Sequence, residues 1–149
     1  MVYARLREGR ASASLQVYVV TTVTQGRAPL FTEFVPARLV VSEMRRLHDL
    51  GLVSSLAWVL MPEHLHWMFA LGTARTLSQV VQLLKGRSAR RLGELTPHVG
   101  PVWQPNFFDR AVRRDDDLAK AARYIVANPL RRGLVNRIGD WPHWDAIWL

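Results

Sequence analysis

Two apolar segments of strand length, residues 52–61 and 64–71, have only Pro62 and Glu63 between them. Such a short connection leaves the chain no room to cross a sheet, so the two segments are predicted to be neighbouring antiparallel strands. Along a strand, side chains point alternately to the two faces of the sheet. In the second segment, one face is entirely apolar and is predicted to lie in the core: Leu65, Trp67, Phe69 and Leu71.

The other elements follow from local pattern, and they consist of a strand at 15–24, helices at 34–50 and 76–95, an extended piece within 102–112 and a helix from 115 to about 128. Gly51 ends the first helix, and Thr76 is an N-cap for the second. The last helix begins with three aspartates, which the helix dipole favours there. Pro129 disfavours helix at the residue before it and is expected to end this helix.

The predicted order is therefore β-α-β-β-α-β-α. Its first six elements match the ferredoxin-like split βαβ arrangement, an α+β fold with an antiparallel sheet and helices on one face. A further helix follows at the C-terminal end. Because the sequence shows no repeat, low-complexity tract or long linker, we expect residues 1–149 to form a single domain. This fold serves many functions, so function has to be argued from particular residues.

The charge favours a nucleic-acid partner, because 20 basic residues face 12 acidic ones and all but Lys85 and Lys120 of the basic ones are arginine. Cysteine is absent, which excludes disulfides and thiolate zinc sites and favours a reducing cytosol. No apolar run is long enough to span a membrane, and the N-terminus lacks the pattern of a secretion signal. We therefore expect a cytoplasmic, nucleoid-associated protein.

His64 and His66 lie on one face at the start of a predicted strand, close enough together to bind one divalent ion. The H-x-H pattern alone is also compatible with two partly exposed polar residues near a turn. No H-E-x-x-H motif and no second H-x-[ST] element accompanies it, so neither a zincin nor a two-histidine phosphoesterase fits.

Tyr124 and Asn128 are four residues apart, so both project from one face of the last predicted helix. Asn128 can offer a carbonyl oxygen to a hard cation, and Tyr124 a phenol oxygen as nucleophile. Each residue also has a structural interpretation, as a packed residue at a helix edge and as a C-terminal cap. The combination with the histidine pair favours a site.

The segments MPEHLHWMF, LSQVVQLLKGRSARRL, VWQPNFFDRAVR and YIVANPLRRGLV, in this order and spacing, resemble the REP-associated tyrosine transposases, a branch of the single-tyrosine HUH transposases. The resemblance covers nearly the whole chain. It implies a divalent metal, Mg²⁺ or Mn²⁺, held by His64 and His66 and completed by Asn128. Tyr124 would be the nucleophile on the C-terminal catalytic helix. Glu63 departs from the family pattern, which usually has Asn or Asp there; it either bonds to an imidazole or faces solvent.

The activity implied by the resemblance is cleavage and rejoining of single-stranded DNA at REP-like hairpins through a 5′-phosphotyrosine intermediate, by a monomer or a homodimer. Two basic clusters are predicted to bind the DNA, and they consist of Lys85, Arg87, Arg90 and Arg91 on the second helix and Arg131 and Arg132 after the third. Two alternatives stay open. One is a non-catalytic nucleic-acid-binding module or regulator of the same fold, and the other is a metal-dependent nuclease that uses activated water.

Overall fold

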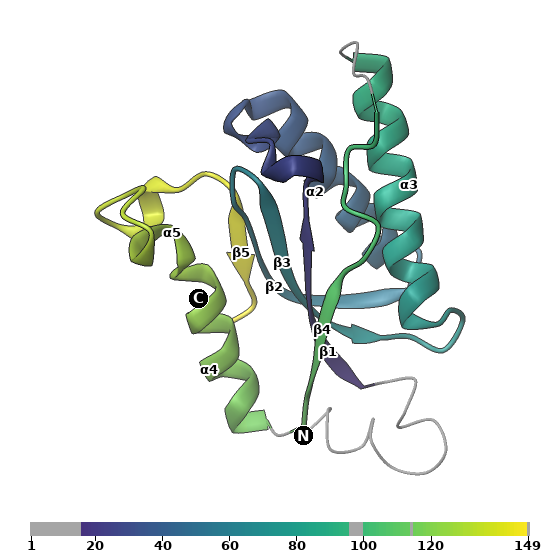
Figure 1. Ribbon diagram of the computed structural model, residues 1–149. Helices are drawn as coiled ribbons and strands as arrows, with labels where there is room; N and C mark the ends of the chain where they lie inside the picture. The colour runs from purple at the N-terminus through teal and green to yellow at the C-terminus, as the bar shows by residue number, and fades with distance from the viewer. Residues whose placement is uncertain (1–15, 96–99, 114, 149) are drawn as a thin grey trace.

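The computed structural model describes residues 16–95, 100–113 and 115–148 and shows an antiparallel sheet with the strand order β4-β1-β3-β2-β5 (Figure 1). The strands are β1 (Val17–Val23), β2 (Val53–Leu60), β3 (His64–Leu71), β4 (Phe108–Val112) and β5 (Trp144–Ala146). The first four have the order of the ferredoxin-like fold, which confirms the predicted fold class.

Helices cover both faces of this sheet (Figure 1). On one face lie α2 (Phe34–Asp49) and α3 (Leu77–Leu95), and on the other α4 (Asp115–Val126), which continues into the single turn α5 (Asn128–Arg131). Three short 3-10 turns complete the elements: η2 (Gln25–Arg27), η3 (Leu30–Thr32) and η4 (Ile138–Asp140). The described part of the chain contains no helix that is long and apolar enough to cross a membrane.

The alternation of β3 divides the core into two. Leu65, Trp67 and Phe69 pack under α2 and α3, as predicted from their spacing. Met68 and Ala70 pack on the opposite face with Leu118 and Ala122 of α4. His64 and His66 belong to this second face by the same alternation, so they lie on the side of the sheet that carries α4.

The two-residue connection at Pro62 and Glu63 joins adjacent antiparallel strands, as predicted. It is closed by a hydrogen bond from Met61 N to His64 O, 2.8 Å long. Two neighbouring segments hold it from outside, since Thr24 N donates to Glu63 O at 2.9 Å and Phe31 N donates to Pro62 O at 3.0 Å. The backbone around the first histidine is therefore fixed on both sides.

The predicted cap of the second helix is also confirmed. Thr76 Oγ1 accepts from Gln79 N at 3.2 Å, and Gln79 Oε1 accepts from Thr76 N at 3.0 Å. This reciprocal pair is a capping box, which satisfies two backbone donors at the helix start.

Two expectations about the C-terminal region need correction. The helix from Asp115 does end ahead of Pro129, at Val126, but Asn128 is helical as well, because Pro129 lies in the first turn of α5, where its missing N–H has no partner to lose. Tyr124 and Asn128 consequently lie on two successive helices rather than on one. Beyond these helices, Trp141, Trp144 and Trp148 pack on the α4 side of the core, and residues Trp144–Ala146 pair with β2 as a fifth strand, which the sequence did not predict.

Candidate functional site

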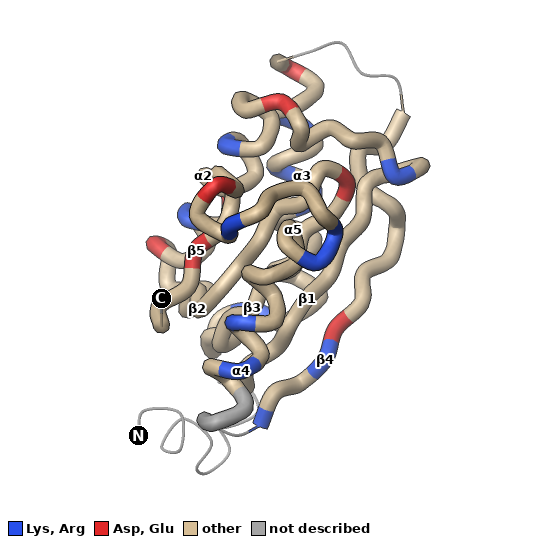
Figure 2. Tube along the Cα trace, turned by 90° about the vertical axis from the view of Figure 1, so that its left-hand side faces the viewer, with Lys and Arg blue, Asp and Glu red and all other residues tan. Residues whose placement is uncertain are grey.

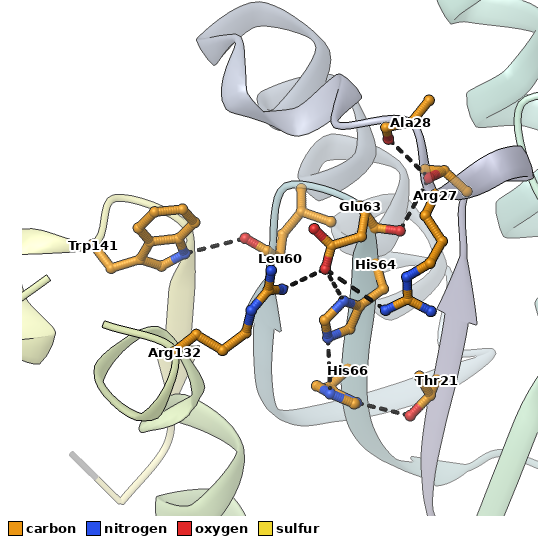
Figure 3. A network of polar contacts seen from close by, with 10 residues as sticks. Thr21, Arg27, Ala28, Leu60, Glu63, His64, His66, Arg132 and Trp141 are labelled. Carbon is orange, nitrogen blue, oxygen red and sulfur yellow. Dashed lines mark hydrogen bonds and ion pairs between the residues drawn. The ribbon is translucent and has the colours of Figure 1, made fainter. Parts of the chain in front are cut away.

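The two histidines face each other at the start of β3. Their Nε2 atoms are 3.1 Å apart, and their rings meet edge to face with centroids 4.6 Å apart. The Nδ1 atoms point away from this contact, His64 Nδ1 to Glu63 Oε1 at 2.7 Å and His66 Nδ1 to Thr21 Oγ1 at 2.7 Å (Figure 3). Each imidazole is thus held from behind while its Nε2 faces the other.

Strand pairing supplies the second of these contacts. Thr21 lies directly opposite His66 in the register of β1 and β3, so the two side chains project from the same face as neighbours. The β1–β3 register could not be read from the sequence, and Thr21 was therefore not predicted as a site residue. Alternation along β1 shows which of its side chains share a face with Thr21, but it does not show which residue of β3 lies opposite Thr21.

Glu63 is buried, with 7 % of its surface exposed, and does not face solvent. Its Oε1 atom accepts from Arg132 and from His64 and lies 4.0 Å from Arg27. Burial raises the pKa of the Glu63 carboxyl, but the hydrogen bonds from Arg132 and His64 outweigh this and hold the pKa below its usual value. The carboxylate is therefore ionised at neutral pH and orients the His64 ring.

Both histidines are neutral at pH 7. Burial lowers the pKa of His66 to about 4, helped by the charges of His64 and Arg131. Burial also lowers the pKa of His64, more strongly than the Glu63 carboxylate raises it. Neutral imidazoles have a lone pair to donate, which a metal ligand requires.

The arrangement fits a divalent cation. Because His64 Nδ1–H donates to Glu63, the lone pair of His64 is on Nε2, and Thr21 can fix His66 in the same tautomer. Two ligands about 2.1 Å from one ion and at right angles lie roughly 3.0 Å apart, close to the observed Nε2–Nε2 distance. No three His, Asp or Glu side chains converge within the described residues, so a third protein ligand has to be of another type.

Asn128, the predicted third ligand, has an amide side chain and lines the same cavity as His66. A cavity of about 230 Å³ lies between the sheet and the last two helices. Thr21 and His66 line it from the sheet, and Tyr124, Asn128 and Arg131 line it from α4 and α5. Tyr124 is 65 % exposed. Four of the predicted site residues, Tyr124, His66, Asn128 and Arg131, therefore meet in one cavity of one chain, and His64 adjoins it through His66.

Arg131 and Arg132, predicted together, have separate positions. The Arg131 guanidinium carbon is 3.8 Å from the centroid of the Tyr124 ring, and its NH1 donates to Tyr124 O at 2.6 Å. Arg132 reaches across to Glu63 and so connects the end of α5 to the beginning of β3 (Figure 3). One arginine covers the tyrosine ring, and the other holds the tyrosine-bearing helices against the histidine-bearing strand.

The basic residues of α3 lie elsewhere, since α3 packs on the opposite face of the sheet. Arg87 Nε and Arg91 NH1 bind the two carboxylate oxygens of buried Glu43 at 2.7 and 2.6 Å. Lys85 Nζ donates to the backbone carbonyls of Gln104 and Asn106. Arg90 is exposed. The structure does not bring this cluster to the cavity that holds Tyr124.

Fold and site together define a class: a ferredoxin-like sheet with paired histidines on one strand and a tyrosine and an amide on the helices facing it. The chain belongs to the IS200-like transposase family, whose sequence profile matches residues 12–128. It is 31 % identical over 87 residues to the REP-associated tyrosine transposase of Escherichia coli K12, covering 58 % of this chain and 50 % of that protein. The chain therefore matches about half the length of this relative.

The fold is also shared with a solved structure, described as a REP-associated tyrosine transposase bound to a REP hairpin. The TM-score is 0.75 at 22 % identity, and the match covers 88 % of this chain and 76 % of the other. These comparisons confirm the resemblance drawn from the four sequence segments.

Proposed function

We propose that this protein is a metal-dependent transposase that cleaves and rejoins single-stranded DNA at REP-like hairpins through a 5′-phosphotyrosine intermediate. The observation that supports it most is the meeting of Tyr124, His66 and Asn128 in one cavity of one chain. The hairpin is carried over from the relative with the same fold, and the basic composition agrees with a DNA substrate. Such a substrate would place the protein at the nucleoid.

The phosphodiester is the difficult partner in this reaction, because its negative charge repels a nucleophile. A Mg²⁺ or Mn²⁺ ion held by His64, His66 and Asn128 would supply a Lewis acid for a non-bridging phosphate oxygen. Glu63 and Thr21 serve this site by fixing the tautomer and orientation of the two imidazoles.

Tyr124 carries the covalent step. Its phenol oxygen forms a bond to phosphorus and loses its proton, while the bond from phosphorus to the 3′ oxygen breaks and that oxygen takes up a proton. The 5′ phosphate is then joined to Tyr124. Because one phosphoester replaces another, the reverse attack by a 3′-hydroxyl rejoins DNA without a nucleotide cofactor. The sequence accordingly has no G-x-x-x-x-G-K-[ST] loop.

The helices α4 and α5, which carry Tyr124 and Asn128, are connected to the histidine strand of the same chain by the contact between Arg132 and Glu63. This supports a site assembled within one subunit. Mixing a Tyr124→Phe protein with a His66→Ala protein distinguishes the two arrangements: a site within one chain gives no cleavage from the mixture, and a site shared between two chains restores it.

The decisive experiment is Tyr124→Phe, tested with single-stranded hairpins of REP type in Mn²⁺. The substitution removes one oxygen and keeps the ring under Arg131, so fold and hairpin affinity are expected to persist. The parent is expected to form a protein–DNA adduct that survives denaturation, and the variant is expected to give neither adduct nor cleavage. EDTA should abolish the adduct in the parent.

The other outcomes identify the alternatives. Cleavage by Tyr124→Phe without an adduct would show that activated water is the nucleophile. Hairpin binding by the parent with neither cleavage nor adduct, in Mg²⁺ and in Mn²⁺, would show a binding module.

A further inference from the structure

Arg131 contacts both the side chain and the backbone of Tyr124. Its guanidinium carbon lies 3.8 Å from the centroid of the phenol ring, and its NH1 atom donates to the Tyr124 carbonyl oxygen at 2.6 Å. That carbonyl belongs to the last turn of α4, whose C=O groups have no donor from within the helix. One guanidinium therefore caps α4 and also stacks on the ring of the residue that it caps.

The Tyr124 side chain has few other restraints. The residue is 65 % exposed, and its hydroxyl has no hydrogen-bond partner among the residues that the structure describes. An exposed side chain ordinarily exchanges between staggered rotamers within nanoseconds. A nucleophile, by contrast, has to be held close to the geometry of attack for its reaction to be fast. The stacked guanidinium is the contact best placed to keep the ring in one orientation.

The charge of Arg131 lies inside the proposed site. Arg131 lines the cavity of about 230 Å³ together with His66, Tyr124 and Asn128. It is close enough to His66 for its charge to help lower the pKa of that imidazole, after burial and the charge of His64. In the described part of the chain, no carboxylate lies within ion-pair distance of Arg131. The guanidinium can therefore offset negative charge that develops on the phenol oxygen and on the phosphate.

Two nearby arginines lack these contacts. Arg132, the next residue, binds Glu63 instead. Arg123 precedes Tyr124 in the last turn of α4, is exposed and does not line the cavity. Figure 2 shows basic positions both on α4 and at the end of α5, so positive charge in this region does not by itself distinguish Arg131. Its contact with the tyrosine does.

We propose that Arg131 is a positioning residue for the covalent step: it orients the phenol of Tyr124 and offsets the negative charge that the phenol oxygen acquires as it loses its proton. This inference rests on the proposed function, because it takes Tyr124 as the nucleophile. It gives Arg131 a role beyond the DNA contact expected from its basic cluster. The single turn α5 then positions both the nucleophile and Asn128, a proposed metal ligand.

The first test compares Arg131→Gln with Arg123→Gln, since each removes one positive charge beside Tyr124. Adduct formation is followed in a single turnover, with saturating hairpin and Mn²⁺. We expect Arg131→Gln to slow it about 10–100-fold, because a small displacement of a reacting group has effects of this size. Hairpin affinity, measured in EDTA, is expected to stay within about threefold of the parent, since the lost interaction acts in the transition state. Arg123→Gln is expected to form the adduct at the rate of the parent.

Mn²⁺ affinity separates positioning of the tyrosine from a general displacement of α5. A displaced α5 would move Asn128 as well and weaken Mn²⁺ binding, measured by calorimetry without DNA. We expect Arg131→Gln to bind Mn²⁺ as the parent does. A parallel loss of Mn²⁺ affinity would overturn the proposal by showing a structural role. Weaker hairpin binding with an unchanged rate at saturation would also overturn it, because Arg131 would then only bind DNA.

The second test needs no cleavage. In protein labelled with fluorotyrosine, the fluorine resonance of Tyr124 is the one that disappears in Tyr124→Phe. We expect this resonance to sharpen and to shift towards that of free fluorotyrosine in Arg131→Gln, and to stay unchanged in Arg123→Gln. An unchanged resonance in Arg131→Gln would overturn the proposal.

The two tests together separate this inference from the proposed function. Equal rates of adduct formation in the parent and in Arg131→Gln would refute the role of Arg131 alone. A resonance that depends on Arg131, in a parent that forms no adduct, would refute Tyr124 as the nucleophile and with it the role of Arg131 in the covalent step.

Discussion

Two buried glutamates each bind arginines, on opposite faces of the same sheet. In the Glu43 cluster (Glu43, Arg87, Arg91), the acid lies between α2 and α3, and its side chain is 3 % exposed. In the Glu63 cluster (Glu63, Arg132, His64), the acid lies at the start of β3, and its side chain is 9 % exposed. The principal arginines are also alike in exposure, at 42–44 % of their side chains.

Since burial and charge are nearly the same, the difference lies in what each carboxylate contacts besides arginine. Glu43 holds two cations of one helix and so joins two helices. Glu63 instead binds the imidazole of His64 and the guanidinium of Arg132, which comes from a distant part of the chain. The Glu43 cluster is therefore a structural clamp that only joins two helices. The Glu63 cluster connects the end of α5 to His64, a predicted ligand of the proposed metal site.

The largest effect on cleavage and metal affinity is expected from Glu63→Gln, with Glu43→Gln as the matched substitution in the other cluster. Glu63→Gln removes the charge that orients His64, and outer contacts to a metal-binding histidine typically contribute 10–100-fold in affinity or activity. We expect losses of this size in cleavage and in Mn²⁺ affinity measured by calorimetry. Glu43→Gln is expected to leave both within about threefold of the parent while lowering the free energy of unfolding by about 1–3 kcal/mol.

Equal losses of Mn²⁺ affinity in both variants would contradict this assignment. Loss of stability without loss of affinity in Glu63→Gln would show that both clusters are structural clamps.

An effect of intermediate size is expected on the pH dependence of stability, which also distinguishes the two faces of the sheet. Burial lowers the pKa of His66 in the folded protein to about 4, below its ordinary value of 6.5. Between these two pH values, the unfolded chain binds a proton at His66 and the folded chain does not. Stability from this group is fully present above pH 6.5 and is lost as the pH falls towards 4. Burial raises the pKa of Glu43, but the hydrogen bonds and charges of Arg91 and Arg87 outweigh this and hold the pKa below its ordinary value of 4.5. Protonation of Glu43 therefore affects the stability only below about pH 4.5. In EDTA, we expect the melting temperature of the parent to fall between pH 7 and pH 5.

His66→Gln should reduce this fall, and Glu43→Gln should keep it while melting lower throughout. The fall is not expected to vanish in His66→Gln, because burial also lowers the pKa values of His64 and His143. An unchanged fall in His66→Gln would contradict the buried, neutral state assigned to this imidazole.

The smallest effect is expected from Arg90→Glu. Arg90 is exposed on α3 beside the Glu43 cluster, on the face away from Tyr124. If it contacts one phosphate of the hairpin, its reversal lowers the slope of log affinity against log salt by about one or slightly more. Arg46→Glu on α2 is the control and should leave the slope unchanged. An unchanged slope in Arg90→Glu as well would show that Arg90 contacts no phosphate of the hairpin.

The sequence predicted the elements whose cause is local. The two-residue connection at Pro62 and Glu63 forced β2 and β3 together, the Thr76 cap began α3, and the alternation of β3 separated the core residues from the histidines. Pro129 correctly predicted that the helix from Asp115 ends nearby, but it did not predict α5, because a proline that follows one helix is also well placed in the first turn of the next.

Only the tertiary structure decided which distant groups meet. The pairing of His66 with Thr21 depends on strand register, and that of Glu63 with Arg132 joins residues 69 positions apart. Local pattern gave the arginines of α3 and those after α4 the same appearance, yet Arg87 and Arg91 bind Glu43, whereas Arg131 and Arg132 lie beside the proposed site. A residue's sequence neighbours fix its secondary structure and its face, whereas its partner across the fold is chosen by packing of the whole chain.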